Sequence, residues 1–150
     1  MRPIKFKGKA VITIEELERY DIPHENGWVT GNLIKNGDSP VISSDIYELI
    51  EESIYPKWWV VVEVDSVGQY TGLKDKDSKK IYENDVAFDE HIECFGVVKF
   101  DEGKFIYEWE NVCEDLAEVH DSIIVTNNEY EVKHQLEVQA WQNASNAKKK

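Results

Sequence analysis

The stretch Val67–Asp89, VGQYTGLKDKDSKKIYENDVAFD, constrains the fold of this chain more than any other. Gly68 and Gly72 bracket Gln-Tyr-Thr and permit a tight bend at a place where a Cβ atom would clash. The polar run KDKDSKK that follows contains three turn formers, Asp75, Asp77 and Ser78. Apolar residues then supply the next strand: Ile81, Tyr82, Val86 and Phe88. The stretch therefore predicts strand, bend, strand, polar turn and strand.

Elements of both kinds are predicted before this stretch. The segments IKFKGKAVITI and GWVTGNLI read as strands, with a turn at KNGDSP. Between the strands, Thr13 and Glu16 have the spacing of a capping box, which predicts a short helix over residues 14–20. Residues 46, 49, 50 and 54 are apolar and fall at helical spacing after Ser43 and Ser44, so a second helix is predicted there, closed by Pro56.

The remainder of the chain is dominated by short alternating segments. WWVVVEV, FGVVKFD, KFIYEWE and DSIIVTN are all typical of strands, and the second and third form a hairpin through Glu-Gly. Residues 131–147 favour a polar helix, although LEVQA also alternates as a strand does, and the three terminal lysines are expected to be disordered. We predict a mainly β protein with minor α content, whose second half is a small antiparallel barrel or sandwich.

The central stretch resembles the signature of the YopX-like proteins, which are encoded by phages and prophages. IKFKGK, GWVTGNLI, GVVKFDEGKF and SIIVTNNEYE resemble further segments of that family, so the likeness covers most of residues 4–131. Asn84 and Thr126 stand where the family typically has glycine, and Asn tolerates left-handed backbone conformations. The residues that carry the signature are Gly68, Gln69, Tyr70, Thr71, Gly72, Leu73, Asp75, Ile81, Tyr82, Glu83, Asp85 and Val86.

The resemblance implies an SH3-like barrel in a family without an established molecular function. We expect a mixed N-terminal lobe over residues 1–65 packed on a barrel over residues 66–131, followed by a tail over residues 132–150. Whether the signature residues are structural or bind a ligand is left open by the sequence.

The charge of the chain limits its partners. A net charge of −13 on 150 residues repels phosphate backbones, so direct nucleic-acid binding is not expected. No secretory signal and no segment long enough to cross a bilayer is evident, and Cys94 and Cys113 are expected to be free thiols. The bacterial cytoplasm is the expected location, with no membrane association.

The spacings of the candidate metal-binding and catalytic residues do not match those of known sites. The run from Asp75 begins like a calcium loop, but Lys80 replaces the required glycine and Val86 the bidentate glutamate. His91, Cys94, Cys113 and His120 lack the close pairs of zinc sites. We therefore expect a solvated turn at Asp75 and Asp77, no metal, no cofactor and no catalytic residues; of Glu83 and Asp85, one side chain should cap the turn.

Two functional hypotheses remain, with an enzyme as a third. The first is an accessory protein that binds an unknown protein partner without catalysis, and the second is an acidic DNA mimic that inhibits a nucleic-acid-binding protein. A homodimer is expected as well, because a small barrel and a lobe leave surplus aromatic residues for a subunit contact, among them Trp28, Trp58 or Trp59, Trp109 and Trp141. Period-two geometry places Trp58 and Trp59 on opposite faces, one in the core and the other against the lobe or exposed.

Overall fold

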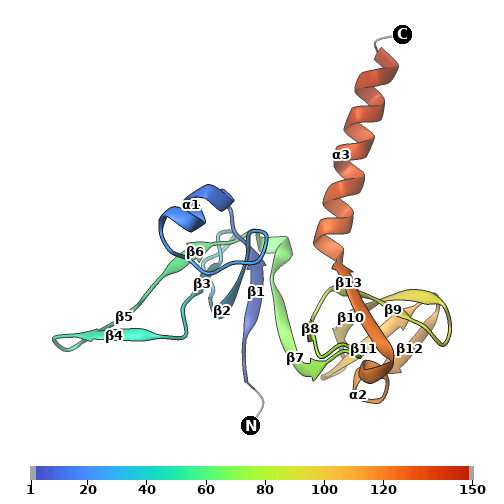
Figure 1. Ribbon diagram of the computed structural model, residues 1–150, viewed down its shortest axis with the longest axis horizontal. Coiled ribbons are helices and arrows are strands. Elements are labelled where there is room, and N and C mark those ends of the chain that lie inside the picture. The colour runs from blue at the N-terminus through green and yellow to red at the C-terminus, as the bar shows by residue number, and fades with distance from the viewer. Residues whose placement is uncertain (1–2, 149–150) are drawn as a thin grey trace. The chain divides into compact units, whose positions relative to one another are not determined.

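A computed structural model describes residues 3–148 and divides the chain into two compact units. Unit 1 ends at Gly72 and unit 2 begins at Leu73. Lys149 and Lys150, two of the terminal lysines for which disorder is predicted, lie outside the described residues. Each unit has its own hydrophobic core, and strands dominate both, which confirms the prediction of a mainly β protein with minor α content (Figure 1).

Unit 1 is built on an antiparallel sheet with one short helix. Its elements are β1 (Phe6–Lys9), α1 (Ile14–Arg19), β2 (Trp28–Ile34), β3 (Val41–Ser43), β4 (Tyr47–Ile50), β5 (Ser53–Pro56), β6 (Trp59–Val61) and the 3-10 turn η1 (Val64–Ser66). The sheet order is β6-β3-β2-β1-β7-β8, in which β7 (Gly68–Lys74) and β8 (Lys80–Tyr82) come last in the chain and β8 belongs to unit 2. The strands β4 and β5 form a separate two-stranded sheet. Leu17 of α1 is fully buried with Val29 of β2, Ile42 of β3 and Val62, which follows β6.

The cap of α1 follows the sequence. The Thr13 hydroxyl accepts a hydrogen bond from the Glu16 amide at 3.1 Å, and the helix begins at Ile14 as predicted. The prediction of a second helix is wrong. Residues 47–56 form the β4–β5 hairpin, in which Leu49 pairs with Ile54 and Glu51 turns the chain with a φ of 57°.

The strand β7 (Gly68–Lys74) runs through the division between the units. Gly68 and Gln69 pair with Lys7 and Phe6 of β1. The predicted bend between the two glycines is therefore wrong, because the segment is one continuous strand. Gly72 does have the left-handed backbone that glycine permits, with a φ of 84°, but within this strand.

Unit 2 is a five-stranded antiparallel sheet followed by a long helix. Its elements after β7 are β8 (Lys80–Tyr82), β9 (Asp85–Asp89), β10 (Cys94–Asp101), β11 (Lys104–Trp109), β12 (Val112–Asp115), α2 (Leu116–Val119), the 3-10 turn η2 (His120–Ser122), β13 (Ile123–Asn128) and α3 (Glu129–Lys148). The sheet order is β12-β11-β10-β9-β13. The antiparallel strands and the β10–β11 hairpin are confirmed; closure into an SH3-like barrel stays a prediction.

The core of unit 2 lies on one face of this sheet. Ala87, Val98 and Tyr107 are fully buried there with Leu116 of α2 and Ile123 of β13. The Tyr107 ring lies against Gly96, where an added Cβ would come within 2.5 Å of it. The Tyr107 hydroxyl donates a hydrogen bond to the Ala87 carbonyl at 3.0 Å, and burial raises the pKa of Tyr107 to about 12. We call the opposite face of this sheet the outer face.

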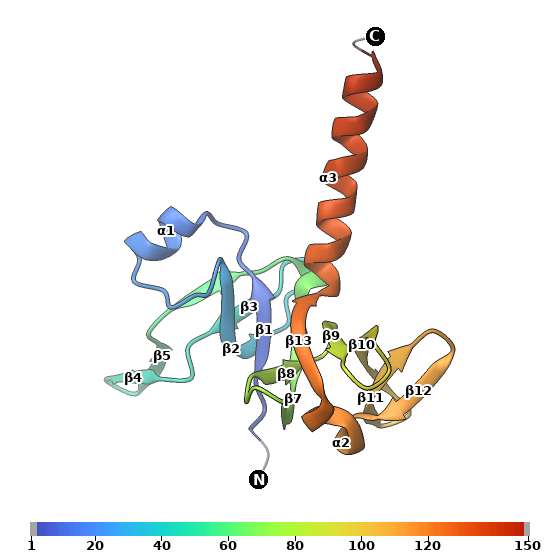
Figure 2. The ribbon, with the colours of Figure 1, turned by 45° about the vertical axis from the view of Figure 1, so that its right-hand side comes forward.

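The helix α3 continues from β13 as a single rod (Figures 1 and 2). Its apolar side chains do not form a stripe, and Leu136 and Trp141 are exposed. The helix predicted over residues 131–147 is present and begins two residues earlier. Within residues 3–148, no helix combines the length and the apolar character needed to cross a membrane.

Candidate interaction surface on the C-terminal sheet

The signature segment is held together by buried carboxylates. Asp75 is 5% exposed, and its Oδ1 accepts hydrogen bonds from the amides of Asp77 at 2.9 Å and Lys79 at 2.8 Å. Its Oδ2 accepts from the Val125 amide of β13 at 2.9 Å. The expectation of a solvated turn is therefore wrong for Asp75, although Asp77 and Ser78 are exposed. These three backbone donors come from the turn and from β13, so the carboxylate ties the turn to β13.

Asp85 and Asp89 have comparable roles in β9. The Asp85 Oδ2 accepts a hydrogen bond from the Tyr82 amide at 2.8 Å, and the Asp89 Oδ1 accepts from the His91 amide at 2.9 Å. Both residues are buried. Of the pair Glu83 and Asp85, Asp85 makes the predicted cap and Glu83 is half-buried.

The backbone conformation of Asn84, in the turn before β9, accounts for the residue type at this position. Its φ of 72° is left-handed, which confirms that a residue tolerant of this conformation is needed where the related signature has glycine. Its amide donates to the Val98 carbonyl at 2.7 Å, and its carbonyl accepts from the Glu129 amide at 2.8 Å, at the start of α3. Thr126, the other substituted glycine position, lies at the register shift between Val125 and Asn127.

The remaining signature residues are largely buried. Tyr70, Thr71, Ile81 and Tyr82 have little exposed surface, and Leu73 packs against the core of unit 2. The signature thus contributes strands and turn anchors.

An ion pair also fixes the polar turn. Lys76 Nζ lies 2.8 Å from Glu90 Oε2, beyond the end of β9. The hydrogen bond to Glu90 raises the pKa of Lys76 above its usual value, and the same bond lowers the pKa of Glu90. Both side chains are half-exposed, so the pair orients the turn and contributes little to stability.

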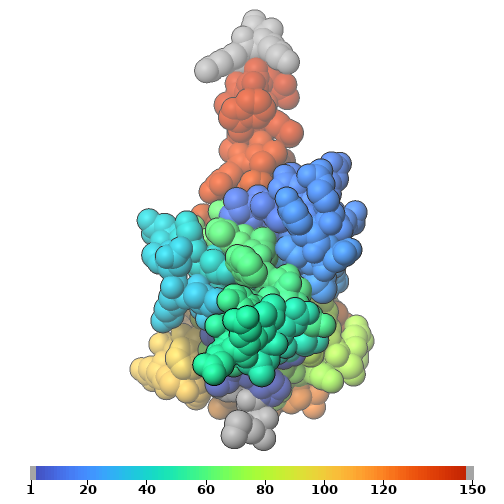
Figure 3. Space-filling model, turned by 90° about the vertical axis from the view of Figure 1, so that its left-hand side faces the viewer, coloured from blue at the N-terminus to red at the C-terminus, as the bar shows by residue number. Residues whose placement is uncertain are grey.

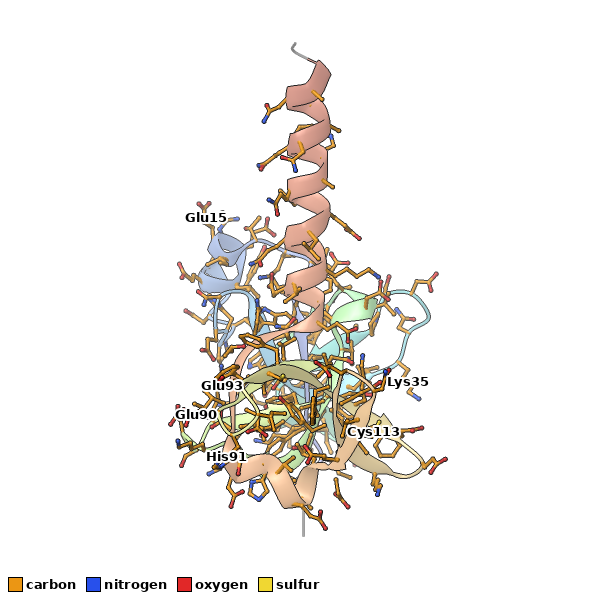
Figure 4. The ribbon with its side chains drawn as sticks, turned by 90° about the vertical axis from the view of Figure 1, so that its right-hand side faces the viewer. Glu15, Lys35, Glu90, His91, Glu93 and Cys113 are labelled. Carbon is orange, nitrogen blue, oxygen red and sulfur yellow. The ribbon has the colours of Figure 1, made fainter. Side chains whose placement is uncertain are left out.

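The histidines and cysteines considered as ligands are dispersed. Figure 4 shows His91 and Cys113 on opposite sides of unit 2. Cys94 is half-buried at the start of β10, and Cys113 is exposed in β12. His120 Nδ1 lies 2.7 Å from the Lys74 carbonyl oxygen. Among residues 3–148, no three His, Cys, Asp or Glu side chains are grouped as metal ligands.

The outer face of the sheet has an open hollow of about 350 Å³. It is lined by Val86 of β9, by Phe95 and Val97 of β10, and by Trp109 at the end of β11. Phe95 is 62% exposed, and its ring centroid is 5.0 Å from that of Phe88. Sequence reasoning missed this surface, because alternation along β10 assigns Phe95 and Val97 to the face opposite Gly96 and Val98 but does not say which face is covered.

The residues that line the hollow carry more negative than positive charge. Lys99, the basic residue in its lining, forms an ion pair with Glu129 of α3 and lies 3.4 Å from Asn84 Oδ1. Glu108 and Glu110 are exposed residues of its lining. Neither carboxylate forms an ion pair with another described residue. The hollow therefore combines apolar lining residues with uncompensated negative charge.

The tryptophans divide as their alternation predicts. Trp58 packs against the core of unit 1, whereas Trp59 is 61% exposed, so of the two alternatives left open for the second tryptophan, exposure is the one observed. Trp28 lies beneath the lysine ammonium groups of Lys7 and Lys9, at 5.4 and 5.8 Å from its ring centroid.

Comparison with known proteins agrees with the resemblance of the signature. The chain has no match in a search of curated proteins. A family model described as YopX protein matches residues 22–138, which include β2, the β4–β5 hairpin, the signature strands, the five-stranded sheet and the first half of α3. This match covers most of the chain, and the chain therefore belongs to the YopX family.

Proposed function

We propose that this protein is a non-enzymatic interaction module that binds a basic segment of a partner protein in the hollow on the outer face of the unit 2 sheet. The bound segment carries an apolar side chain that enters the hollow, flanked by Lys or Arg residues. The proposal includes a role as a phage or prophage accessory protein in the bacterial cytoplasm. The observation that supports it best is the exposed Phe95 beside the unpaired carboxylates of Glu108 and Glu110.

The apolar part of the hollow supplies an anchor site. Aromatic residues are enriched where protein interfaces are most strongly bound, and Phe95 is exposed without a covering element. Val86 and Val97 also line the hollow, and both belong to strands that are hydrogen-bonded on both sides in the sheet. A rigid lining requires little ordering when a ligand binds, which reduces the entropic cost of binding.

The acidic residues of the lining supply the preference for a basic segment. Lys99 is already neutralised by Glu129, so the local field at the hollow is that of Glu108 and Glu110. The net charge of −13 extends this field and speeds the approach of a basic partner. Binding should therefore weaken as salt is added, because exposed charges are screened.

The DNA-mimic alternative is less well supported by the positions of the acidic residues. Such a mimic needs carboxylates in regular ranks on one face. Glu51, Glu93, Glu102 and Glu110 instead occupy separate turns, each with a left-handed backbone. An enzyme is disfavoured by the dispersal of the histidines and thiols described above.

Peptide binding tests the proposal. The full chain would be titrated by fluorescence anisotropy against labelled peptides that hold one Phe or Leu between Lys or Arg residues, with acidic and uncharged peptides of the same length for comparison. We expect the basic peptides to bind more tightly, and binding to weaken at least tenfold on Phe95→Asp or on Glu108→Lys combined with Glu110→Lys.

Two matched variants serve as controls. Leu136→Asp places the same charge on an exposed apolar residue of α3, and Glu102→Lys alters charge at the β10–β11 turn. Both should bind peptide within about twofold of the unaltered chain. Equal binding of basic and acidic peptides would overturn the proposal. So would basic-peptide binding that disappears in salt but is insensitive to Phe95→Asp, which is the result expected of a DNA mimic.

A further inference from the structure

The first 14 residues of the sequence differ in charge from the rest of the chain. They contain four cations and no carboxylate, although the whole chain has a net charge of −13. The four cations are Arg2, Lys5, Lys7 and Lys9. Of the other acid-free segments of the sequence, only residues 138–150 hold more than two cations, and these are its last three lysines. An acidic chain thus carries a basic segment of its own. We call residues 1–5 the N-terminal segment.

Ile4 offers an exposed apolar side chain in this segment. It is 67% exposed, and it stands between Arg2 and Lys5 in the sequence. The Lys5 carbonyl accepts a hydrogen bond from the Tyr70 amide at 2.7 Å, and the pairing of β1 begins at Phe6. Both ribbon views show the chain leading away from the sheet ahead of β1 (Figures 1 and 2). Figure 3 shows dark-blue atoms of the first described residues at the surface.

The other apolar side chains near these cations are placed differently. Phe6 and Ile12 pack against the core of unit 1. Val11 and Ile14 are exposed, but they follow the last of the four cations. Only Ile4 is both exposed and flanked by cations on its two sides within the described part of this stretch. One apolar side chain between Lys or Arg residues is the pattern that the hollow of unit 2 is proposed to select.

We propose that the hollow binds the N-terminal segment of a second copy of this chain, so that the protein self-associates through unit 1 of one copy and unit 2 of another. This inference rests on the proposed function, because it names an occupant for the same hollow. Ile4 enters beside Phe95, and the flanking cations lie against the carboxylates of Glu108 and Glu110. The tryptophans expected to mediate a subunit contact are not required for it.

Charge complementarity supports this occupant. Lys5 Nζ lies 3.5 Å from Asp45 Oδ2, but both side chains are partly exposed, and such a pair contributes little and exchanges readily. The segment can therefore turn its cations toward Glu108 and Glu110. Repulsion between the net charges of two chains acts over longer distances, and salt screens it beyond about 10 Å at moderate ionic strength. The contact between opposite charges in the hollow is shorter than this distance and keeps more of its strength.

A second copy is favoured over the same chain as the source of the segment. From the Lys5 carbonyl, which is bonded to β7, the four preceding residues reach at most about 14 Å. A second copy is free of this limit, because it can approach the hollow from any direction. Each copy carries one segment and one hollow, so contacts reinforce one another where two form in the same assembly. A foreign basic segment has to displace this occupant, and self-association therefore limits partner binding.

Sedimentation velocity over a concentration series tests the contact. The unaltered chain should sediment faster as its concentration rises through the micromolar range. Ile4→Asp and Phe95→Asp should each weaken association at least about tenfold and leave the 17.4 kDa monomer. Ile14→Asp and Leu136→Asp add the same charge at other exposed apolar positions, and should change association by no more than about twofold. An unaltered chain that stays monomeric overturns the proposal, as does association that survives Ile4→Asp.

Cross-linking identifies the two surfaces and the copies that supply them. Unlabelled chains would be mixed with chains labelled with a heavy nitrogen isotope, and treated with a carbodiimide, which joins a lysine to a carboxylate in contact with it. Lys5 should be joined to Glu108 or Glu110 in peptide pairs that carry one label from each chain. Pairs in which both peptides always carry the same label would place the segment in its own chain, and would overturn the second copy as the occupant.

Peptide titration separates this inference from the proposed function. The Ile4→Asp chain lacks the competing segment, so a basic peptide should bind it at least about threefold more tightly than it binds the unaltered chain, at concentrations where the latter associates. Equal binding to both chains would leave the proposed function standing and overturn the second copy as the occupant. No binding to either chain would overturn the proposed function, and this inference with it.

Discussion

At the scale of single residues, the polar positions of the signature are explained by buried turn anchors. Asp75 receives three amide hydrogen bonds, and one of them comes from Val125, 50 residues further along the chain. Asp85 accepts a hydrogen bond from the Tyr82 amide, and Asp89 accepts one from the His91 amide. Among the described residues, every buried side-chain nitrogen and oxygen has a hydrogen-bond partner. The carboxylates in the turns thus stabilise the strand connections, and a ligand is not needed to account for them.

Asp75→Asn should destabilise the fold, although asparagine has nearly the same shape. One oxygen can still accept from Asp77 and Lys79, but the new amide group would face the Val125 N–H, so two donors would meet. A buried donor without an acceptor costs about 1–3 kcal/mol, in addition to the lost charged hydrogen bond. We expect the free energy of unfolding, measured by urea denaturation, to fall by roughly 2–4 kcal/mol.

Asp77→Asn is the matched control, because Asp77 is exposed in the same turn. Its effect on the free energy of unfolding should stay within about 0.5 kcal/mol. If Asp75→Asn leaves stability unchanged, the carboxylate is not the anchor described above.

The sequence could identify these residues as turn formers but not as buried ones. The spacing of Asp75 and Asp77 is local information, and it correctly indicates a turn. The burial of Asp75 depends on its bond to β13, which is brought near only by the pairing of the sheet. The same limit applies to the hollow, since the exposure of Phe95 depends on which face of β10 is covered.

At the scale of elements, hairpins differ in how well the residue types in their turns suit the backbone conformation there. Asp101 pairs with Lys104, so Glu102 and Gly103 form a two-residue turn, and both have left-handed φ values of 49° and 82°. Two-residue turns of this kind favour Asn-Gly. Glutamate at the first position is strained, because its Cβ approaches the backbone in this conformation.

Glu102→Asn should therefore stabilise unit 2, raising the free energy of unfolding by about 0.5–1 kcal/mol in urea denaturation. Gly103→Ala is the converse test. No atom lies within 4 Å of the added Cβ, so any loss of stability would come from the backbone alone. A loss of about 1 kcal/mol is expected, and no loss would show that the turn is not strained.

The β4–β5 hairpin shows why one element was predicted incorrectly. Ile46, Leu49, Ile50 and Ile54 match helical spacing, but the intervening Tyr47 and Tyr55 are typical of strands, and a short apolar segment fits both patterns. The turn at Glu51 and Glu52 lacks the Asn-Gly or Asp-Gly signal of a hairpin. Strands with stronger local signals, β2, β10 and β11, were predicted correctly.

At the scale of the whole molecule, the chain has two separate cores. Leu17 lies in the core of unit 1 and Leu116 in that of unit 2, and both are fully buried. Sequence patterns favoured two parts, with a boundary at residues 65 and 66, whereas the compact units divide at Gly72. No local signal marks this point, because the chain there is an uninterrupted strand.

Leu17→Ala and Leu116→Ala form a matched pair that tests the separation of the cores. Each substitution removes about the same buried volume. Each should lower the free energy of unfolding by roughly 2–5 kcal/mol, as is typical for buried leucines. In hydrogen-exchange mass spectrometry, Leu17→Ala should speed exchange mainly in β2 and β3, and Leu116→Ala mainly in β10 and β13. Equal acceleration throughout the chain after either substitution would show one cooperative unit.

The strand β7 limits how such a protein can be recombined. Its first residues complete a ladder with β1, and its Leu73 packs in the core of unit 2, with no linker between the two roles. A crossover between related genes at this point would produce a hybrid β7. Its first half would come from one parent and suit that parent's unit 1 sheet, and its second half would suit the unit 2 core of the other parent. Units separated by a loop can be inherited independently, whereas these two must be exchanged together or with a compatible β7.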